Sequence, residues 1–75
     1  MAIKKEDEVI TIKVNYQERK VLKKDYITAK WKQLVEFGYP SLNRDEVEER
    51  CDMILKGDIS RTDVILMMMV DDIVV

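Results

Sequence analysis

The chain has 75 residues, a formal net charge of −2, one cysteine and no histidine. A lone cysteine excludes a disulfide within the chain, and without histidine a single thiol cannot build a zinc site. A domain this close to the lower size limit usually needs a disulfide, a metal or a partner subunit. With a disulfide and a zinc site excluded, self-association is the remaining way to stabilise so small a domain. We therefore expect a homo-oligomer, most simply a dimer.

Hydrophobic residues make up 47% of the chain and charged residues 37%, with two glycines and one proline, which is typical of a folded protein. The start, MAIKKEDEV, lacks the apolar run of a signal peptide. The apolar run near the other end is too short to span a bilayer and is interrupted by two aspartates. With its lone thiol, the chain is expected to be a single cytoplasmic α+β domain over residues 1–75, with a hairpin and three helices.

Residues 8–23 are predicted to form a β-hairpin. In residues 8–14, EVITIKV, β-branched residues alternate between two sides, which indicates a half-buried strand. Residues 15–18 are expected to turn the chain, and residues 19–23 to return as the second strand. Asn15 is the only strong turn residue there, and no Asn-Gly pair supports it.

Residues 25–57 are predicted to form two helices joined by a short turn. Asp25 is a suitable N-cap for the first helix, and Gly38 supplies the left-handed residue that ends it. Ile27, Trp31 and Leu34 fall on one apolar stripe of this helix.

The second helix of the pair has the clearest start in the chain. Asn43 as N-cap, with Glu46 three positions on, resembles a capping box. Leu42 is placed to pack on Val47 across that cap, and Gly57 ends the helix.

Residues 60–75 are predicted to form a third, apolar helix that starts near Arg61. Ser60 as N-cap and Asp63 three positions on repeat the start of the second helix. Leucine and methionine favour a helix in the run VILMMMV, and a strand buried on both faces is the alternative. Such a helix has more apolar circumference than so small a domain can bury, unless the other elements cover it. Four apolar residues lie on the polar side of this predicted helix, and we expect them to form an oligomer interface: Val64, Ile65, Met68 and Val75.

The charges are segregated along the chain. Residues 1–35 carry nine Lys/Arg against five Asp/Glu, a balance of +4, and residues 36–75 carry four against ten, a balance of −6. Four carboxylates recur at helical spacing on the second helix: Asp45, Glu48, Glu49 and Asp52. With Tyr39 in the preceding turn, they predict a surface that binds a basic protein partner. An ordinary solvated face is the alternative, and carboxylates on one rigid helix do not supply the oxygens that calcium needs.

The basic half of the chain indicates an alternative function. Its cations are Arg19, Lys20, Lys23, Lys24, Lys30 and Lys32, with aromatic residues between them. Cations with aromatic platforms are typical of proteins that bind single-stranded nucleic acids, so a nucleic-acid or nucleotide binder is the alternative. Lysines that protect a sheet edge explain the same residues. A helix-turn-helix is excluded, because the acidic second helix would be repelled by phosphates.

The sequence contains no catalytic motif, nucleotide fingerprint or cofactor motif. Cys51 lies on the apolar stripe of the second helix without a histidine to activate it, so it is predicted to be a buried hydrophobe. We expect no enzymatic activity, metal or cofactor. In type, a short acidic α+β chain without motifs resembles accessory proteins of phages and mobile elements, which bind and block host proteins, although no particular residue carries the resemblance. The predicted function is therefore non-catalytic binding, and thereby inhibition, of another protein.

Overall fold

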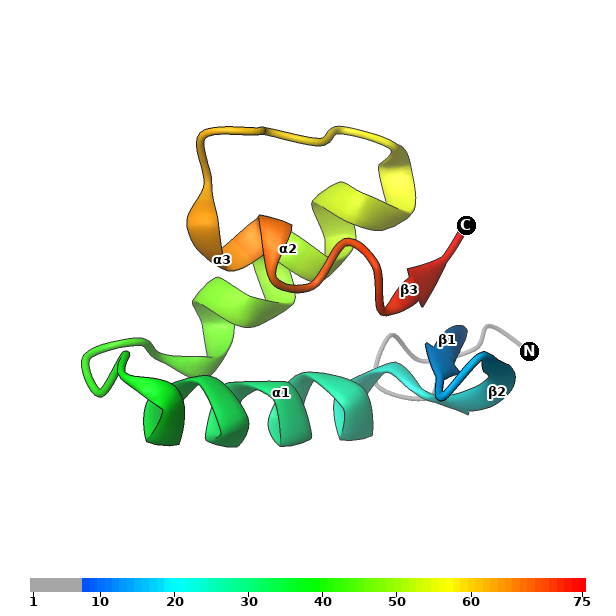
Figure 1. Cartoon of the computed structure of the whole chain (residues 1–75), viewed down its shortest axis with the longest axis horizontal. Helices are drawn as coiled ribbons and strands as arrows, with labels where there is room; N and C mark the ends of the chain where they lie inside the picture. The colour runs from blue at the N-terminus through cyan, green and yellow to red at the C-terminus, as the bar shows by residue number, and fades with distance from the viewer. Residues whose placement is uncertain (1–7) are drawn as a thin grey trace.

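The computed structural model describes residues 8–75, so most of the stretch MAIKKEDEV, on which the prediction about a signal peptide rests, lies outside the described residues. The elements in chain order are β1 (Val9–Val14), β2 (Gln17–Leu22), α1 (Lys23–Phe37), α2 (Arg44–Lys56), α3 (Val64–Met67) and β3 (Ile73–Val74). The strands form one antiparallel sheet in the order β2-β1-β3, which confirms the predicted α+β class. In Figure 1 the sheet lies at one end of α1, and the turn that leads into α2 lies at the other end.

The predicted hairpin is confirmed, with a tighter turn than expected. Val14 pairs with Gln17, so only Asn15 and Tyr16 form the loop. Both loop residues have positive φ, 52° and 66°, as a type I′ turn requires. This turn matches the right-handed twist of the strands, and asparagine adopts positive φ more readily than most residues.

The first helix begins earlier than predicted and ends where predicted. It starts at Lys23, directly after β2, and Leu22 at the N-cap position makes no side-chain cap bond. Asp25 is therefore not the N-cap but lies in the first turn, where its negative charge still favours the helix dipole. Gly38, at a φ of 149°, ends the helix, and its N–H donates to the Leu34 carbonyl at 3.2 Å.

The predicted signals of the second helix are confirmed at both ends. The Asn43 side chain accepts a hydrogen bond from the Glu46 N–H at 3.1 Å. Leu42 and Val47, on either side of this cap, are both buried in the core. Gly57 has a φ of 81°, and its N–H donates to the Ile54 carbonyl at 3.0 Å, as in a glycine-terminated helix.

The predicted C-terminal helix over residues 60–75 is wrong in its start and its extent. Asp63, not Ser60, is the N-cap, and its carboxylate accepts from the Leu66 N–H at 2.9 Å. The helix that follows spans only Val64–Met67, and turns then lead to β3.

The C-terminal residues form a strand because β1 offers them an open edge. Ile73 pairs with Ile12, and Val74 pairs with Thr11. A helix continued to the end of the chain would leave the backbone groups on this edge of β1 unpaired. β-branched residues also fit a pleated sheet better than a helix, so the sheet outweighs the helical pattern.

The hydrophobic core lies between one face of the sheet, the two long helices and the C-terminal segment. Its fully buried side chains are Ile27, Leu34, Val47, Cys51, Ile54, Leu66 and Met69. Ile10 and Ile73 add the buried side chains of the sheet. The apolar run at the C-terminus is therefore partly core: Met69 is buried, whereas Met67 remains partly exposed.

Candidate functional site

An aromatic pair marks the turn between α1 and α2. Phe37, the last residue of α1, is 70% exposed. The Tyr39 ring stacks on it, with ring centroids 6.3 Å apart and an angle of 25° between the planes. Covering an exposed phenylalanine with a partner removes apolar surface from water, and aromatic residues supply much of the binding energy of protein interfaces. This turn is therefore a candidate contact surface.

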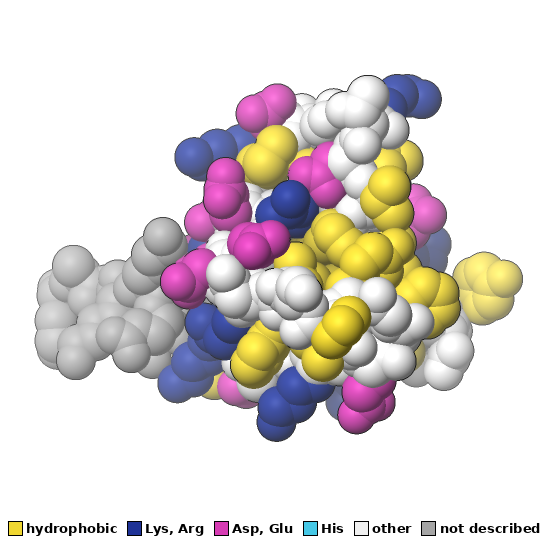
Figure 2. All heavy atoms as spheres, turned by 90° about the vertical axis from the view of Figure 1, so that its left-hand side faces the viewer, with side chains coloured by type: hydrophobic (Ala, Val, Ile, Leu, Met, Phe, Trp, Pro, Cys, Tyr) yellow, Lys and Arg dark blue, Asp and Glu magenta, His cyan; other side chains and the backbone are white. Residues whose placement is uncertain are grey.

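A hollow of about 540 Å³, which we call the turn hollow, lies beside the aromatic pair. Its lining residues are Gly38, Tyr39, Pro40, Ser41, Leu42, Glu46 and Ile65. Glu46 is the one charged residue among these lining side chains. Figure 2, which views the molecule from this end, shows hydrophobic side chains gathered on this face with acidic side chains on another part of it. The turn hollow is thus apolar with one carboxylate, that of Glu46, at its rim, and Figure 2 shows basic as well as acidic side chains elsewhere on this face.

The four carboxylates predicted to bind a partner lie at positions i, i+3, i+4 and i+7 of α2, so they share one side of the helix but differ in exposure. At about 100° per residue, Asp45 and Glu49 lie one turn apart on the outer side of α2, and both are exposed. Glu48 and Asp52 lie next to them on the same side of α2 and are half-buried. Asp52 forms an ion pair with Lys23 of α1. The open part of the predicted acidic surface is therefore Asp45 and Glu49.

Lys23, predicted as part of a nucleic-acid patch, is buried, with 3% of its side chain exposed. Its ammonium pairs with Asp52 and lies 3.6 Å from a Glu8 carboxylate oxygen. Burial opposes the charge, but the hydrogen bond and the charge of Asp52, with Glu8, outweigh it and raise the pKa of Lys23. The side chain is thus charged, paired and out of reach of phosphates.

Of the other basic residues predicted to bind a nucleic acid, one is paired and covered like Lys23, and four are exposed. The Lys30 ammonium lies 2.9 Å from Asp72 Oδ2 and is largely covered. Four remain exposed on the hairpin and α1: Arg19, Lys20, Lys24 and Lys32. The patch that could meet a nucleic acid is smaller than the sequence indicates.

The predicted oligomer interface does not form one helical face, because α3 is only one turn long. Val64 is 60% exposed, and its neighbour Ile65 is buried against the turn hollow. Met68 is half-buried, and Val75, which follows β3, is 82% exposed. Of the four residues, Ile65 lines the turn hollow, whereas Val75 follows the last strand of the sheet.

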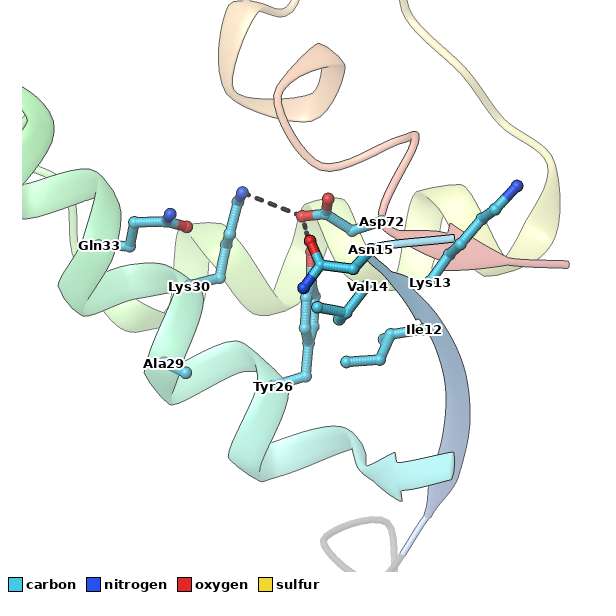
Figure 3. Close-up of a pocket in the computed structure, with 9 residues that line it drawn as sticks. All are labelled: Ile12, Lys13, Val14, Asn15, Tyr26, Ala29, Lys30, Gln33 and Asp72. Atoms are coloured by element: carbon cyan, nitrogen blue, oxygen red, sulfur yellow. Dashed lines mark hydrogen bonds and ion pairs between the residues drawn. The ribbon is translucent and has the colours of Figure 1, made fainter. Parts of the chain in front are cut away.

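A second hollow, which sequence reasoning missed, lies between the end of β1, α1 and the turn before β3 (Figure 3). We call it the Asp72 groove; its volume is about 560 Å³. The Tyr26 hydroxyl donates to Asp72 Oδ2 at 3.1 Å, and the Lys30 ammonium lies 2.9 Å from the same oxygen. Burial, with the nearby charge of Asp72, raises the pKa of Tyr26, so the phenol stays protonated as a donor. The spacing of Tyr26 and Lys30, four residues apart on one helix, was the only local signal for this site.

Cys51 is fully buried, and burial raises the pKa of its thiol to about 11. A protonated, inaccessible thiol is a poor nucleophile, so its contribution is packing. In the part of the chain that the structure describes, no group of three or more His, Cys, Asp or Glu is placed to hold a metal ion. None of the helices described there has the length and apolar character needed to cross a membrane.

Comparison with protein-family models, with curated proteins and with solved structures finds no match to this chain.

Proposed function

We propose that this chain is a non-catalytic binding protein that holds a basic, partly apolar segment of another protein against the turn hollow. The observation that carries the proposal is the exposed Phe37–Tyr39 pair beside a hollow whose lining has one charge, the carboxylate of Glu46. Aromatic and aliphatic side chains of a partner fit the hollow, and its lysines or arginines fit the acidic rim. Binding of this kind would also block the partner's own use of that segment.

The electrostatics around the turn hollow favour a basic partner. Asp45 and Glu49 lie one turn apart on the exposed side of the same helix as Glu46. Two arginines of α2 flank these carboxylates, and both have other partners. The Arg44 guanidinium donates to the Thr28 hydroxyl at 2.9 Å and to a backbone carbonyl of α1. The Arg50 guanidinium pairs with Asp63 at 3.0 Å and donates to the backbone carbonyl of Glu46 at 2.9 Å. The exposed carboxylates of Asp45 and Glu49 would attract cations at a distance.

The experiment uses a short peptide of alternating lysine and leucine, with two control peptides that carry glutamate for lysine or serine for leucine. The reporter is the fluorescence of Trp31, the single tryptophan of the chain, whose indole N–H donates to the carbonyl of Leu42 in the hollow wall at 2.8 Å. We expect a saturable change with the lysine–leucine peptide alone, because only this peptide satisfies both the apolar wall and the acidic rim. Equal responses to all three peptides would contradict the proposal.

Variants assign the binding to this surface. Phe37→Ser and the pair Glu46→Lys with Glu49→Lys should each weaken peptide binding, the second with a smaller dependence on salt. Glu18→Lys is the matched control, since it reverses an exposed charge on β2. If Glu18→Lys weakens binding as much as the α2 reversals, net charge and not the turn hollow attracts the peptide.

The alternative of nucleic-acid binding is tested in the same set of experiments. Its remaining candidates are the exposed Arg19, Lys20, Lys24 and Lys32. A labelled random oligonucleotide that binds with a steep salt dependence, and loses affinity on Lys20→Glu, would favour this alternative over the protein partner.

Self-association remains a proposal, now placed on the exposed apolar residues and not on a long helix. Val64 is exposed and precedes Ile65, the buried residue that lines the turn hollow, so we expect a second copy on Val64 to compete with the peptide for this face. Sedimentation equilibrium of the parent and of Val64→Asp measures it: a dimer that the variant dissociates would identify the second copy as an occupant. A parent that stays monomeric at high micromolar concentration would contradict self-association and leave the peptide proposal standing.

A further inference from the structure

The Asp72 groove is built differently from the turn hollow. Its wall carries a positive and a negative side chain in direct contact, Lys30 and Asp72, and the largely buried Tyr26 fixes the carboxylate from below. Figure 3 shows these three groups meeting at the centre of the groove, with the dashed contacts converging on one carboxylate oxygen. A small pocket with convergent polar groups on an apolar wall is the usual form of a ligand site.

The polar groups of the groove have hydrogen-bonding capacity that residues 8–75 do not use. Both contacts of the Asp72 carboxylate fall on Oδ2, which leaves Oδ1 without a hydrogen bond from residues 8–75. The Lys30 ammonium has three hydrogens and one carboxylate partner within that range. The side-chain amides of Asn15 and Gln33 also line the groove, and neither makes a hydrogen bond to a described residue. The groove is therefore lined by an acceptor and by donors with unused capacity among the described residues.

The charge pattern selects the ligand. A simple anion would meet Lys30 but also the carboxylate of Asp72, and a simple cation would meet Asp72 but also the ammonium of Lys30. A ligand with one group of each sign, close together, can place each opposite its complement, so that the four charges alternate. A free α-amino acid has this arrangement, since its ammonium and carboxylate are attached to the same carbon atom.

We propose that the Asp72 groove binds a free α-amino acid with an aliphatic side chain. Its carboxylate would accept from Lys30, and its ammonium would donate to Oδ1 of Asp72. The side chain would lie on the apolar wall formed by Ile12, Val14 and Ala29. Asn15, held in the type I′ turn, supplies a further polar group at the mouth of the groove.

The test uses the unmodified protein, labelled with ¹⁵N, and three related compounds. L-leucine carries both charges, N-acetyl-L-leucine lacks the ammonium, and L-leucine amide lacks the carboxylate. We expect saturable shifts of the amide signals of the groove with millimolar leucine, and affinities weaker by roughly tenfold or more for each derivative, because each leaves one charge of the ion pair without its complement. No saturable shift with leucine, or equal binding of the three compounds, would overturn the proposal.

Variants then identify the residues. Asp72→Asn and Lys30→Met should each weaken leucine binding by roughly tenfold or more, and the matched control Lys32→Met, on the exposed side of the same helix, should not. Phe37→Ser, which should weaken peptide binding at the turn hollow, should leave leucine binding unchanged, so the two proposals fail independently. Leucine binding that survives Asp72→Asn would place the ligand elsewhere and contradict the assignment.

Discussion

The two ends of the molecule are held together in different ways. At the sheet end, polar side chains contact partners far along the chain: Lys23 pairs with Asp52, and the Tyr26 hydroxyl reaches Asp72, 46 residues away. At the turn end, the polar contacts span shorter stretches of chain: the Trp31 indole reaches the Leu42 carbonyl, 11 residues away, and the Glu46 N–H bonds the Asn43 side chain, three residues away. The first kind of contact requires the whole chain to be folded, whereas the second needs only α1, the turn and the start of α2.

This difference predicts how each end responds to a substitution. Contacts at the sheet end are charged and largely covered, so the loss of one partner leaves a charge in a poorly solvated place. Contacts at the turn end are bonds to backbone groups, which water can partly replace. The free energy of unfolding should therefore fall more for changes at the sheet end.

The largest effect should come from Asp52→Ala. It leaves the ammonium of Lys23, 3% exposed, with only the more distant and half-exposed Glu8 as a described counter-charge. Because Asp52 itself is partly solvated, we expect a loss of about 2–3 kcal/mol in the free energy of unfolding, measured by urea denaturation.

The double variant Lys23→Met with Asp52→Ala is the control for this prediction. It removes the buried charge together with its partner, so much of the lost stability should return. If the single variant stays within about 0.5 kcal/mol of the parent, the ion pair does not stabilise the sheet end and the contrast between the two ends is wrong.

A smaller effect is expected for Tyr26→Phe. The change removes the hydroxyl that donates to Asp72 at 3.1 Å, while Lys30 continues to neutralise the carboxylate. We expect a loss of about 1 kcal/mol, measured by thermal unfolding. Tyr16→Phe, at the exposed loop of the hairpin, is the matched control and should be neutral. Equal effects of the two variants would show that the hydroxyl of Tyr26 contributes nothing specific.

The contrast also explains which features could be predicted from the sequence. The start of α2 at Asn43, its end at Gly57 and the end of α1 at Gly38 each rest on one or two residues with a special backbone role. Such signals act within a few residues, so the sequence displays them directly. The hairpin was predictable for the same reason, although Tyr16 at positive φ carried no signal of its own.

The C-terminal segment and the Asp72 groove could not be predicted, because both depend on contacts across the sheet. Residues 60–75 carry a helical start and a helical pattern, yet Ile73 and Val74 pair with β1. A helix would have placed Asp72 on a solvated face, which hid its contacts with Tyr26 and Lys30. Tertiary pairing outweighs a local pattern here, as it often does for short β-branched segments.

At the turn end, Asn43→Ala should cost about 1 kcal/mol, the typical value of an N-cap. The variant removes the acceptor for the Glu46 N–H at 3.1 Å and leaves the buried Leu42 and Val47 unchanged. Asn43→Ser keeps a cap oxygen and should retain most of the stability. Thermal unfolding of both variants measures the difference. A loss for Asn43→Ala that exceeds the loss for Asp52→Ala would reverse the expected order of the two ends.

The smallest effect should be a pH dependence at Asp63, which combines the two kinds of contact. Its carboxylate caps α3 locally through the Leu66 N–H, and it pairs with Arg50 of α2 at 3.0 Å. Partial burial opposes ionisation, but the Leu66 N–H and Arg50 together lower the pKa of Asp63 below its ordinary value of 3.8. A lowered pKa in the folded state means that the contribution is fully present above the unfolded value and is lost as the pH falls through the folded value.

Asp63→Asn is the control that isolates this effect, because asparagine also caps a helix but does not titrate. At neutral pH the variant should be slightly less stable than the parent. It keeps the helix cap but loses the carboxylate charge that pairs with Arg50. As the pH falls below about 4, the parent should lose stability faster until the two converge. Urea denaturation of both proteins across this range measures the difference. A constant gap at every pH would mean that Asp63 acts through its local cap alone, and would place α3 with the turn end of the molecule.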